Sequence, residues 1–516
     1  MKKNLSAWGL LWISLTSMIG SGWLFGSLYS AHFAGPAAVL AWPIAGFLLL
    51  FVALSYAEIA TMFSRSDTLA RLPLYTHGRL TSVIMSGLAW ISLAITPVIE
   101  TQGLMQYASN YLPHLVVRHG VHYENTLLGY LFSLGILMSF VFFNYFGIRF
   151  FARINAGFTI WKILIPGVTV IALLSVSYHA ENFSQYGGFM PYGWQGVMHA
   201  MSSGGVLFSL LGFRQVVIMM GEIDNPGKYV PLVLVGSLLL TTVLYTGLQW
   251  SFIGSMRALD LSHGWASLSF EGDAGPFAAL AGFAGIIWLS VTLYIDAFVS
   301  PYATGLVYST TAAHMLAGMA DMGDVPQVLA SKNNYQVPWV SLGANFLLAA
   351  GMLFVLRGWQ EMAAFSVVVL MFSYSIGPIC LVCLRRQLPS YTRSFRLRFG
   401  TIIAFIGFYI CSAGIYWAGF RSVQQLLVLM FLGLGFYVFF CGFFKKSQED
   451  FDGKHALWLL CYLFGLGVFS YAGNYGGKHW MPPYWDLLYL MGFSAIIFGL
   501  ALFSRKSDEY TQGIVP

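Results

Sequence analysis

The stretch SMIGSGWLFG, residues 17–26, lies in the first long apolar segment of the chain. It places Gly20, Gly22 and Gly26 within seven residues, and each glycine costs a helix interior roughly 1 kcal/mol. In a membrane, backbone released by a helix break must find partners within the protein or in a water-lined cavity. The stretch therefore predicts a broken helix with a binding site near the middle of the membrane.

A second candidate break is SLLGF at residues 209–213. It would begin the second half of the helical core, as the first break begins the first half. Interrupted helices at corresponding places in two halves of a chain are the best sequence pointer to the substrate site of a transporter. The two halves show no obvious sequence repeat, so the breaks alone indicate a repeated architecture.

The composition indicates an all-α polytopic membrane protein. Of the 516 residues, 58% are hydrophobic and 9% are charged, whereas soluble domains carry roughly 25% charged residues. A transmembrane barrel would show weak alternating segments rather than long apolar runs. The net charge of +6 does not indicate a nucleic-acid partner, because the basic residues lie in short loops between apolar segments. The lipid bilayer is the expected surrounding.

Apolar runs long enough to cross a bilayer, about 17–25 residues, predict fourteen spans, with twelve as the alternative. The last pair is the least regular. The runs lie at roughly 8–30, 37–63, 82–112, 126–148, 152–176, 197–220, 230–254, 277–318, 338–356, 361–384, 400–418, 423–444, 456–473 and 486–504.

The loop charges predict that both termini lie in the cytoplasm. Most of the 26 lysines and arginines fall on the side of the N-terminus, beginning with Lys2, Lys3 and Arg65. Cytoplasmic loops of membrane proteins carry an excess of these residues. The few on the other side are Arg118, Arg257, Arg357, Arg421 and Lys478.

Several further motifs accompany the two breaks in a fixed order. They are GPAA at 35–38, ALSYAEIA at 53–60, GEIDNP at 221–226, SP at 300–301 and GDVP at 323–326. With the first span, this ordered set resembles the amino acid–polyamine–organocation permeases over roughly residues 8–390. Within that family the GSGWLFG run is most similar to the aspartate:proton symporter group.

The resemblance implies a LeuT-type core of five plus five spans in inverted topology, with alternating access around a central site. Residues 1–390 would form this core, and residues 391–516 would form four peripheral helices and a short cytoplasmic tail. The expected location is the cytoplasmic (inner) membrane of a bacterium. A receptor or scaffold with many helices would not explain two broken helices together with buried charges.

The two breaks predict where an amino acid backbone binds. Amide groups at the start of a half-helix favour a carboxylate, and the free carbonyls of an unwound stretch favour an ammonium group. We expect the amides of Ser21 and Gly22 to hold the α-carboxylate, and the carbonyls of Met18, Phe208 and Leu211 to hold the α-amine. Close helix packing through small residues is the alternative. The predicted residues are Met18, Ser21, Gly22, Phe208, Ser209 and Leu211.

Lys162 lies within the fifth predicted span, where a charged side chain is costly and suggests a function. By resemblance, several family members have a lysine here, where sodium-coupled relatives bind sodium. We therefore expect no sodium site, and Ser300 and Thr304 are the candidate partners of the ammonium group. The alternative is snorkelling toward the inner interface, about 13 Å away at Arg153.

Arg214 follows the second break directly. A guanidinium beside an unwound helix forms two parallel hydrogen bonds with a carboxylate. If the breaks hold the substrate backbone, Arg214 is available for a side-chain carboxylate, which predicts an acidic substrate. The alternative is a structural ion pair with Glu100 or an inner-gate salt bridge.

Two carboxylates within predicted spans are candidate proton carriers. They are Glu100 in the third span and Asp296 in the eighth. The alternatives are permanent ion pairs, of Glu100 with Arg214 and of Asp296 with Lys162. Glu58, near the inner end of the second span, is better explained as a gate or loop-anchoring residue.

The resulting prediction is a secondary amino acid transporter, proton-coupled and sodium-independent, for aspartate or glutamate. An exchanger for a neutral or cationic amino acid or a polyamine is the alternative, and a non-transporting membrane sensor is another. An enzyme is not expected, because the histidines show no metal-ligand spacing. No cofactor or metal is expected, and no phosphate-binding motif is present to use ATP. The sequence leaves the oligomeric state open.

Overall fold

The computed structural model describes residues 6–63, 68–119, 122–146, 148–219, 223, 225–443 and 452–515. Lys2, Lys3 and Arg65, which entered the charge analysis, lie outside the described residues. So do residues 221, 222 and 224 of the GEIDNP motif.

The first predicted break is present. Two residues, Ile19 and Gly20, separate helix α1 (Ala7–Met18) from α2 (Ser21–Ala34), and both have non-helical backbone angles. Because Gly20 lies against the carboxylate of Glu100, a Cβ atom at this position would collide with it. The glycine therefore permits both the break and the close approach of a neighbouring helix.

The second interruption is displaced from its predicted position. The sharp bend of 52° falls between α8 (Gly193–Ser203) and α9 (Val206–Leu210), at Gly204 and Gly205. Gly205 has φ +86° and lies against the ring of Trp359, so a side chain would be strained and obstructed there. The predicted stretch 209–213 forms only a tighter 3₁₀ turn before α10 (Arg214–Met219).

Every other predicted span coincides with a helix, in one case with the pair α12 and α13. Within the described ranges, nine segments are long and apolar enough to cross a membrane, or ten with the bent α8–α9 pair, so the chain is a polytopic helical membrane protein. The count of fourteen stays a prediction, because α1, α14 and the apolar part of α17 are shorter and α13 is not among these segments. The helices are α3 (Ala38–Met62), α5 (Arg79–Ala108), α6 (Leu127–Tyr145), α7 (Ile148–Val176), α11 (Pro226–Gly254), α12 (Pro276–Phe283), α13 (Ile287–Asp321), α14 (Trp339–Val355), α15 (Gly358–Gln387), α16 (Gly400–Trp417), α17 (Phe420–Phe443), α18 (Gly453–Ala472) and α19 (Trp485–Phe503).

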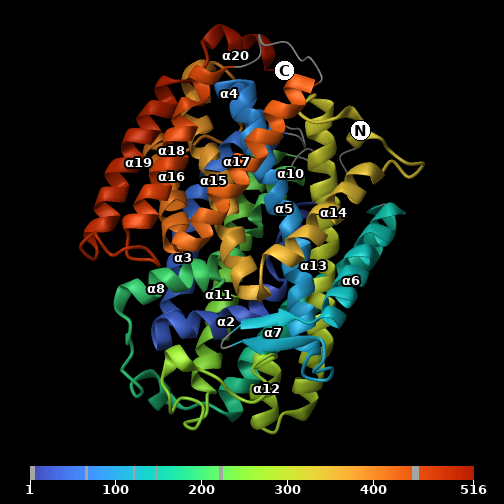
Figure 1. Ribbon diagram of the computed structural model, residues 1–516, viewed down its shortest axis with the longest axis vertical. Helices are drawn as coiled ribbons and strands as arrows, with labels where there is room; N and C mark the ends of the chain where they lie inside the picture. Colours follow the sequence, from blue (N-terminus) through green and yellow to red (C-terminus); the bar gives the residue numbers. More distant parts are fainter. Residues whose placement is uncertain are drawn as a thin grey trace.

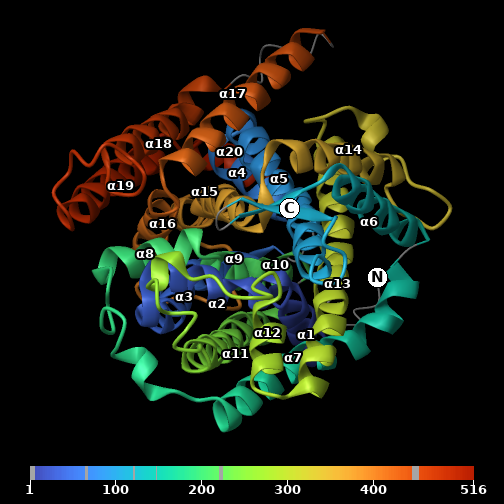
Figure 2. The ribbon, with the colours of Figure 1, turned by 60° about the horizontal axis from the view of Figure 1, so that its bottom comes forward.

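The first half of the broken first helix, α1, lies inside the bundle. Helix α5 packs against α13 and α15, α3 packs against α11, and α1 contacts α7, α10, α11 and α13. Helices α16, α18 and α19 lie together on one side and α6 and α14 on the other (Figures 1 and 2). The short helices α4 (Thr68–His77) and α20 (Asp508–Ile514) lie at the end opposite α12 (Figure 1). A division of the chain at residue 390 stays a prediction.

A small hairpin, absent from the sequence prediction, joins α5 to α6. Its antiparallel strands are β1 (Val116–His119) and β2 (His122–Asn125). Arg118 forms an ion pair with Asp273 at 3.0 Å, and the Tyr123 hydroxyl donates a hydrogen bond to the same carboxylate. Burial raises the pKa of Asp273, while these two partners oppose the shift. The hairpin is thereby held against the loop that precedes α12.

Candidate functional site

The carboxylate of Glu100 caps the second half of the broken first helix. The backbone N–H of Ser21, the first residue of α2, donates to Oε2 of Glu100 at 2.6 Å. Glu100 comes from α5 and is 1% exposed. A negative group at this position satisfies a free amide and interacts favourably with the helix dipole. The predicted α-carboxylate position at Ser21 is therefore held by a side-chain carboxylate in this conformation.

Tyrosine hydroxyls hold carbonyl groups at the first break and at the 3₁₀ turn that follows the second. The bonds join Tyr245 to the carbonyl of Met18 (2.8 Å), Tyr308 to that of Ser17 (3.4 Å) and Tyr374 to that of Leu211 (2.6 Å). Met18 and Leu211 are two of the predicted acceptors for a substrate ammonium group. A carbonyl oxygen has two lone pairs, so each retains an acceptor site beside its tyrosine.

The ammonium group of Lys162 joins three helices in the interior. Its Nζ donates to the carbonyl of Thr16 on α1 at 3.1 Å and to Oγ1 of Thr304 on α13 at 2.6 Å. Lys162, on α7, is fully buried. The snorkelling interpretation is therefore wrong, since the amine bonds inside the bundle. Thr304 is its partner as predicted, whereas Ser300 bonds elsewhere.

Asp296 lies one turn from Ser300 on α13. Its Oδ1 accepts hydrogen bonds from the Ser300 hydroxyl and from the Trp161 indole, both at 2.7 Å. Its Oδ2 is buried and has no hydrogen-bond partner among the described residues. Within the residues that the structure describes, Asp296 and Lys162 form no ion pair. The permanent pair that the sequence suggested for them is therefore not formed.

The guanidinium of Arg214 has only uncharged partners among the residues described. It donates to Oγ of Ser92 at 3.0 Å, to Oγ of Ser373 at 3.4 Å and to the carbonyl of Ala89 at 3.4 Å. It also lies over the ring of Tyr374, 5.3 Å from the centroid. Arg214 is 5% exposed. The ion pair with Glu100 that the sequence suggested is not formed.

A narrow cavity extends from the first break to residues 208–211, which follow the second, and it has room for about one water molecule. From the predicted set it is lined by Met18, Gly22, Glu100, Phe208, Ser209 and Leu211; Ser17, Gly20, Thr96, Tyr308 and Leu370 complete the lining. Ser21 and Arg214 lie beside it without lining it. Helical spacing offered a signal for two of the missed residues, because Thr96 precedes Glu100 by four residues and Tyr308 follows Thr304 by four.

Trp359 on α15 covers one end of the site and was missed by the sequence analysis. Its indole N–H donates to Oγ of Ser21 at 2.7 Å. Its ring stacks on Tyr29 with centroids 5.5 Å apart and meets Phe208 edge-on at 5.9 Å. The side chain of Ser21 and its backbone amide are thus held by two different helices. Position 359 offered no sequence signal, because it stands at the start of an apolar run.

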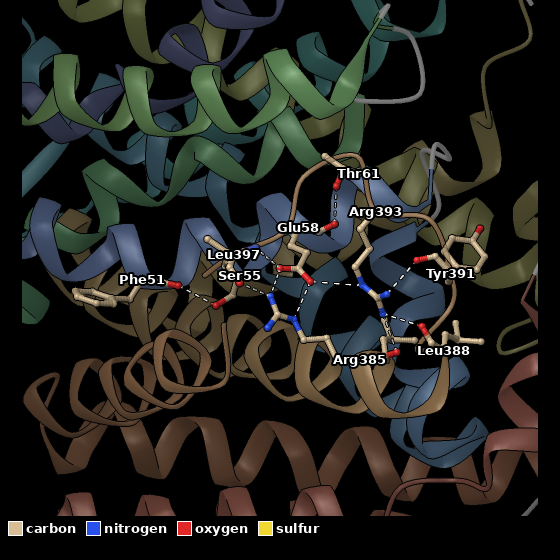
Figure 3. Close-up of polar contacts among 10 residues, drawn as sticks. Phe51, Ser55, Glu58, Thr61, Arg385, Leu388, Tyr391, Arg393 and Leu397 are labelled. Atoms are coloured by element: carbon tan, nitrogen blue, oxygen red, sulfur yellow. Dashed lines mark hydrogen bonds and ion pairs between the residues drawn. The ribbon is translucent and has the colours of Figure 1, made fainter. Parts of the chain in front are cut away.

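A second buried carboxylate, Glu58, lies at the end of α3 (Figure 3). Arg385 forms two parallel hydrogen bonds with it, at 2.8 and 2.5 Å, and Nε of Arg393 lies 3.5 Å away. The backbone N–H of Leu397 donates to the same group at 2.8 Å. The carboxylate therefore fixes the loop between α15 and α16, in agreement with the loop-anchoring interpretation.

Two interrupted helices beside a buried polar cavity are typical of the substrate site of a membrane transporter. The chain matches the family model described as amino acid permease over residues 5–439. It therefore belongs to the amino acid permease family, whose members are transporters rather than enzymes and whose substrates are amino acids.

The relatives in Bacillus subtilis (strain 168) include the glutamate/serine transporter AimA. It is 35% identical over 519 residues, covering 99% of this chain and 96% of the relative. The aspartate-proton symporter is 30% identical over 481 residues, covering 92% and 91%. The branched-chain amino acid permease BcaP is 24% identical over 462 residues, covering 87% and 95%.

Proposed function

We propose that the chain takes up an acidic amino acid, aspartate or glutamate, together with a proton and without sodium. Arg214 is the observation on which the substrate class rests. A buried guanidinium that has only neutral partners has lost water without gaining a counter-ion, which is costly. A carboxylate that arrives with the substrate would supply that counter-ion in bidentate geometry.

The position of Arg214 supports this role. On α5, its partner Ser92 lies four residues from Thr96 of the cavity lining, and Arg214 itself follows the lining residue Leu211 by three. Both offsets correspond to about one helical turn, roughly 5 Å. A substrate whose backbone lies at the two breaks would direct its side chain along this path toward the guanidinium.

The environment of Lys162 supports sodium independence. Its ammonium group binds the Thr16 carbonyl and the Thr304 hydroxyl. By resemblance, sodium-coupled relatives place the ion here, so a fixed cation on these oxygens takes the role of sodium. Proton coupling then falls to Glu100 or Asp296, two of the buried carboxylates that form no ion pair among the described residues.

The proposal includes the LeuT-type core of five plus five spans within residues 1–390. Spans eleven to fourteen would be peripheral, and both termini would lie in the cytoplasm of a bacterium. Support comes from the family, the loop charges and the correspondence between predicted spans and helices. Labelling of single cysteines in the 474–485 loop tests the last hairpin, which requires access from outside.

Uptake in proteoliposomes tests the function directly. The purified chain is supplied with a panel of labelled amino acids, with and without an imposed pH gradient and with and without sodium. We expect aspartate or glutamate to accumulate when the outside is acidic, and removal of sodium to have no effect. Strict sodium dependence, or transport of cationic amino acids alone, would refute the proposal.

A small hydroxylated amino acid such as serine is the second candidate. It is favoured by the name of the 35% identical relative, a glutamate/serine transporter, and by the hydroxyl groups of Ser17, Thr96 and Ser209 in the cavity lining. Such a substrate would leave Arg214 without a carboxylate. The same uptake panel separates the two, since serine transport would then survive loss of the guanidinium.

A further inference from the structure

The carboxylate of Glu100 occupies the place that the proposed function assigns to the α-carboxylate of the substrate. It accepts the hydrogen bond of the Ser21 amide, and both Glu100 and Gly22 line the cavity beside the first break. The side chain reaches this position from another helix, α5. Gly20 leaves it room, because any Cβ there would meet the carboxylate oxygens.

Among the described residues, no lysine or arginine forms an ion pair with this carboxylate. Electrostatic interactions reach Glu100 from Lys162 on α7, Tyr245 on α11 and Tyr308 on α13. Arg214 on α10 acts on Tyr308 beyond it. Lys162 is bonded to Thr16 and Thr304, and within the described residues it makes no ion pair with Glu100. Two carboxylates at one half-helix terminus would repel each other, so both cannot stay ionised there.

We propose that Glu100 is an internal stand-in for the α-carboxylate of the substrate. When ionised, it caps α2 and keeps the substrate out. When protonated, it loses its charge and leaves the Ser21 amide, which can then donate its hydrogen bond to the carboxylate of the amino acid. This inference rests on the proposed function and adds to it the residue and atom at which proton and substrate are coupled.

The exchange conserves charge and protons. One proton moves from the outer solution to Glu100, and one substrate carboxylate replaces the Glu100 carboxylate at Ser21. On the cytoplasmic side the substrate leaves, Glu100 releases the proton to water, and its carboxylate returns to the amide. The empty carrier therefore reorients with α2 capped by its own side chain. Uptake without a proton would require two carboxylates in one place.

The test measures substrate affinity against pH on the purified full-length chain, with L-glutamate and L-aspartate between pH 5.5 and 8.5. Above the pH at which Glu100 ionises, we expect the affinity of the wild type to fall about tenfold per pH unit, because one proton is bound with each substrate. In Glu100→Gln the affinity should be independent of pH. The matched control Asp296→Asn should keep the tenfold slope.

Proton uptake on binding is a second measurement, made by calorimetry in buffers of different ionisation enthalpy. It can be made on the wild type without any substitution. We expect about one proton per substrate in the wild type and about none in Glu100→Gln. A wild type that binds substrate without a proton, a slope that persists in Glu100→Gln, or a slope lost in Asp296→Asn would overturn the inference. Failure to bind any amino acid at any pH would instead overturn the proposed function on which it rests.

Discussion

Glu58 and Glu100 are both buried glutamates in long helices, yet their surroundings differ. Glu58 has two arginines and a backbone amide around it, and Arg385 holds it in bidentate geometry. Glu100 has one backbone amide and faces a cavity. A carboxylate with its own cations stays ionised and fixes the segments it joins, whereas one without them can exchange its proton. Charge compensation, rather than burial, separates the structural glutamate from the proposed functional one.

The same contrast applies to the cations. Arg385 is committed to Glu58, and its charge holds a loop. Lys162 and Arg214 bind only neutral oxygens among the residues described. Neither forms an ion pair within the described residues, although Lys162 interacts electrostatically with Glu100 and Asp296. Each can therefore respond to a charge that enters the site. This comparison can be tested at each of its members.

Lys162→Ala is expected to have the largest effect. Without the ammonium group, the carbonyl of Thr16 and the hydroxyl of Thr304 lose the charge that joins α1 to α13. We expect initial uptake in proteoliposomes to fall roughly a hundredfold or more, equivalent to about 2.8 kcal/mol. Thermal unfolding of the purified variant should show a folded protein. Wild-type uptake by this variant would contradict the assigned role.

Glu58→Gln should act on stability instead. It leaves the buried side chain of Arg393 and the partly exposed one of Arg385 without a counter-charge. Breaking a buried pair by removing one charge costs about 3 kcal/mol or more. The expected result is a clear loss of unfolding free energy in detergent or lipid. The control Arg386→Gln, at an exposed neighbour of Arg385, should change stability by only about 0.5 kcal/mol. Equal effects of both substitutions would remove the distinction between the two glutamates.

Arg214→Ala tests the guanidinium, which binds only uncharged groups among the described residues. A charge-assisted contact in a partly desolvated site contributes about 1.5–3 kcal/mol, so affinity for aspartate or glutamate should fall roughly ten- to a hundredfold. Neutral amino acids should be affected less. Calorimetry on the purified protein measures both. If the wild type binds a neutral or cationic amino acid but neither acidic one, the guanidinium has a structural role.

The sequence was sufficient to locate the helices and the first break, because apolar runs and glycine clusters act locally. It placed the second break one turn too late. The bend falls at Gly204 and Gly205, where the ring of Trp359 approaches the chain from α15. Such an approach depends on tertiary packing, which neither propensity nor spacing records. The hairpin of β1 and β2 was missed for a similar reason, since its anchor Asp273 is distant in sequence.

For the candidate site, the charged residues could be predicted, whereas most of their partners, Thr304 of Lys162 excepted, could not. Glu100, Lys162 and Arg214 stood out because charges within apolar runs are costly. The sequence suggested pairing Glu100 with Arg214, but Glu100 bonds to Ser21 instead. Which buried acid meets which base depends on the rotation of each helix about its axis. Hydropathy leaves that rotation undetermined.

Trp359→Phe should have the smallest effect and sharpens the comparison at Ser21. The substitution keeps an aromatic ring against Tyr29 but removes the indole N–H that binds Oγ of Ser21. A neutral hydrogen bond contributes about 0.5–1.5 kcal/mol, so substrate affinity should fall by about two- to tenfold. The pH dependence of binding should be unchanged, because the Glu100 carboxylate still accepts the hydrogen bond of the Ser21 amide. Measuring substrate affinity at several pH values separates the role of Trp359 from that of Glu100. An affinity independent of pH in this variant would assign the proton coupling to the Ser21 side chain rather than to Glu100.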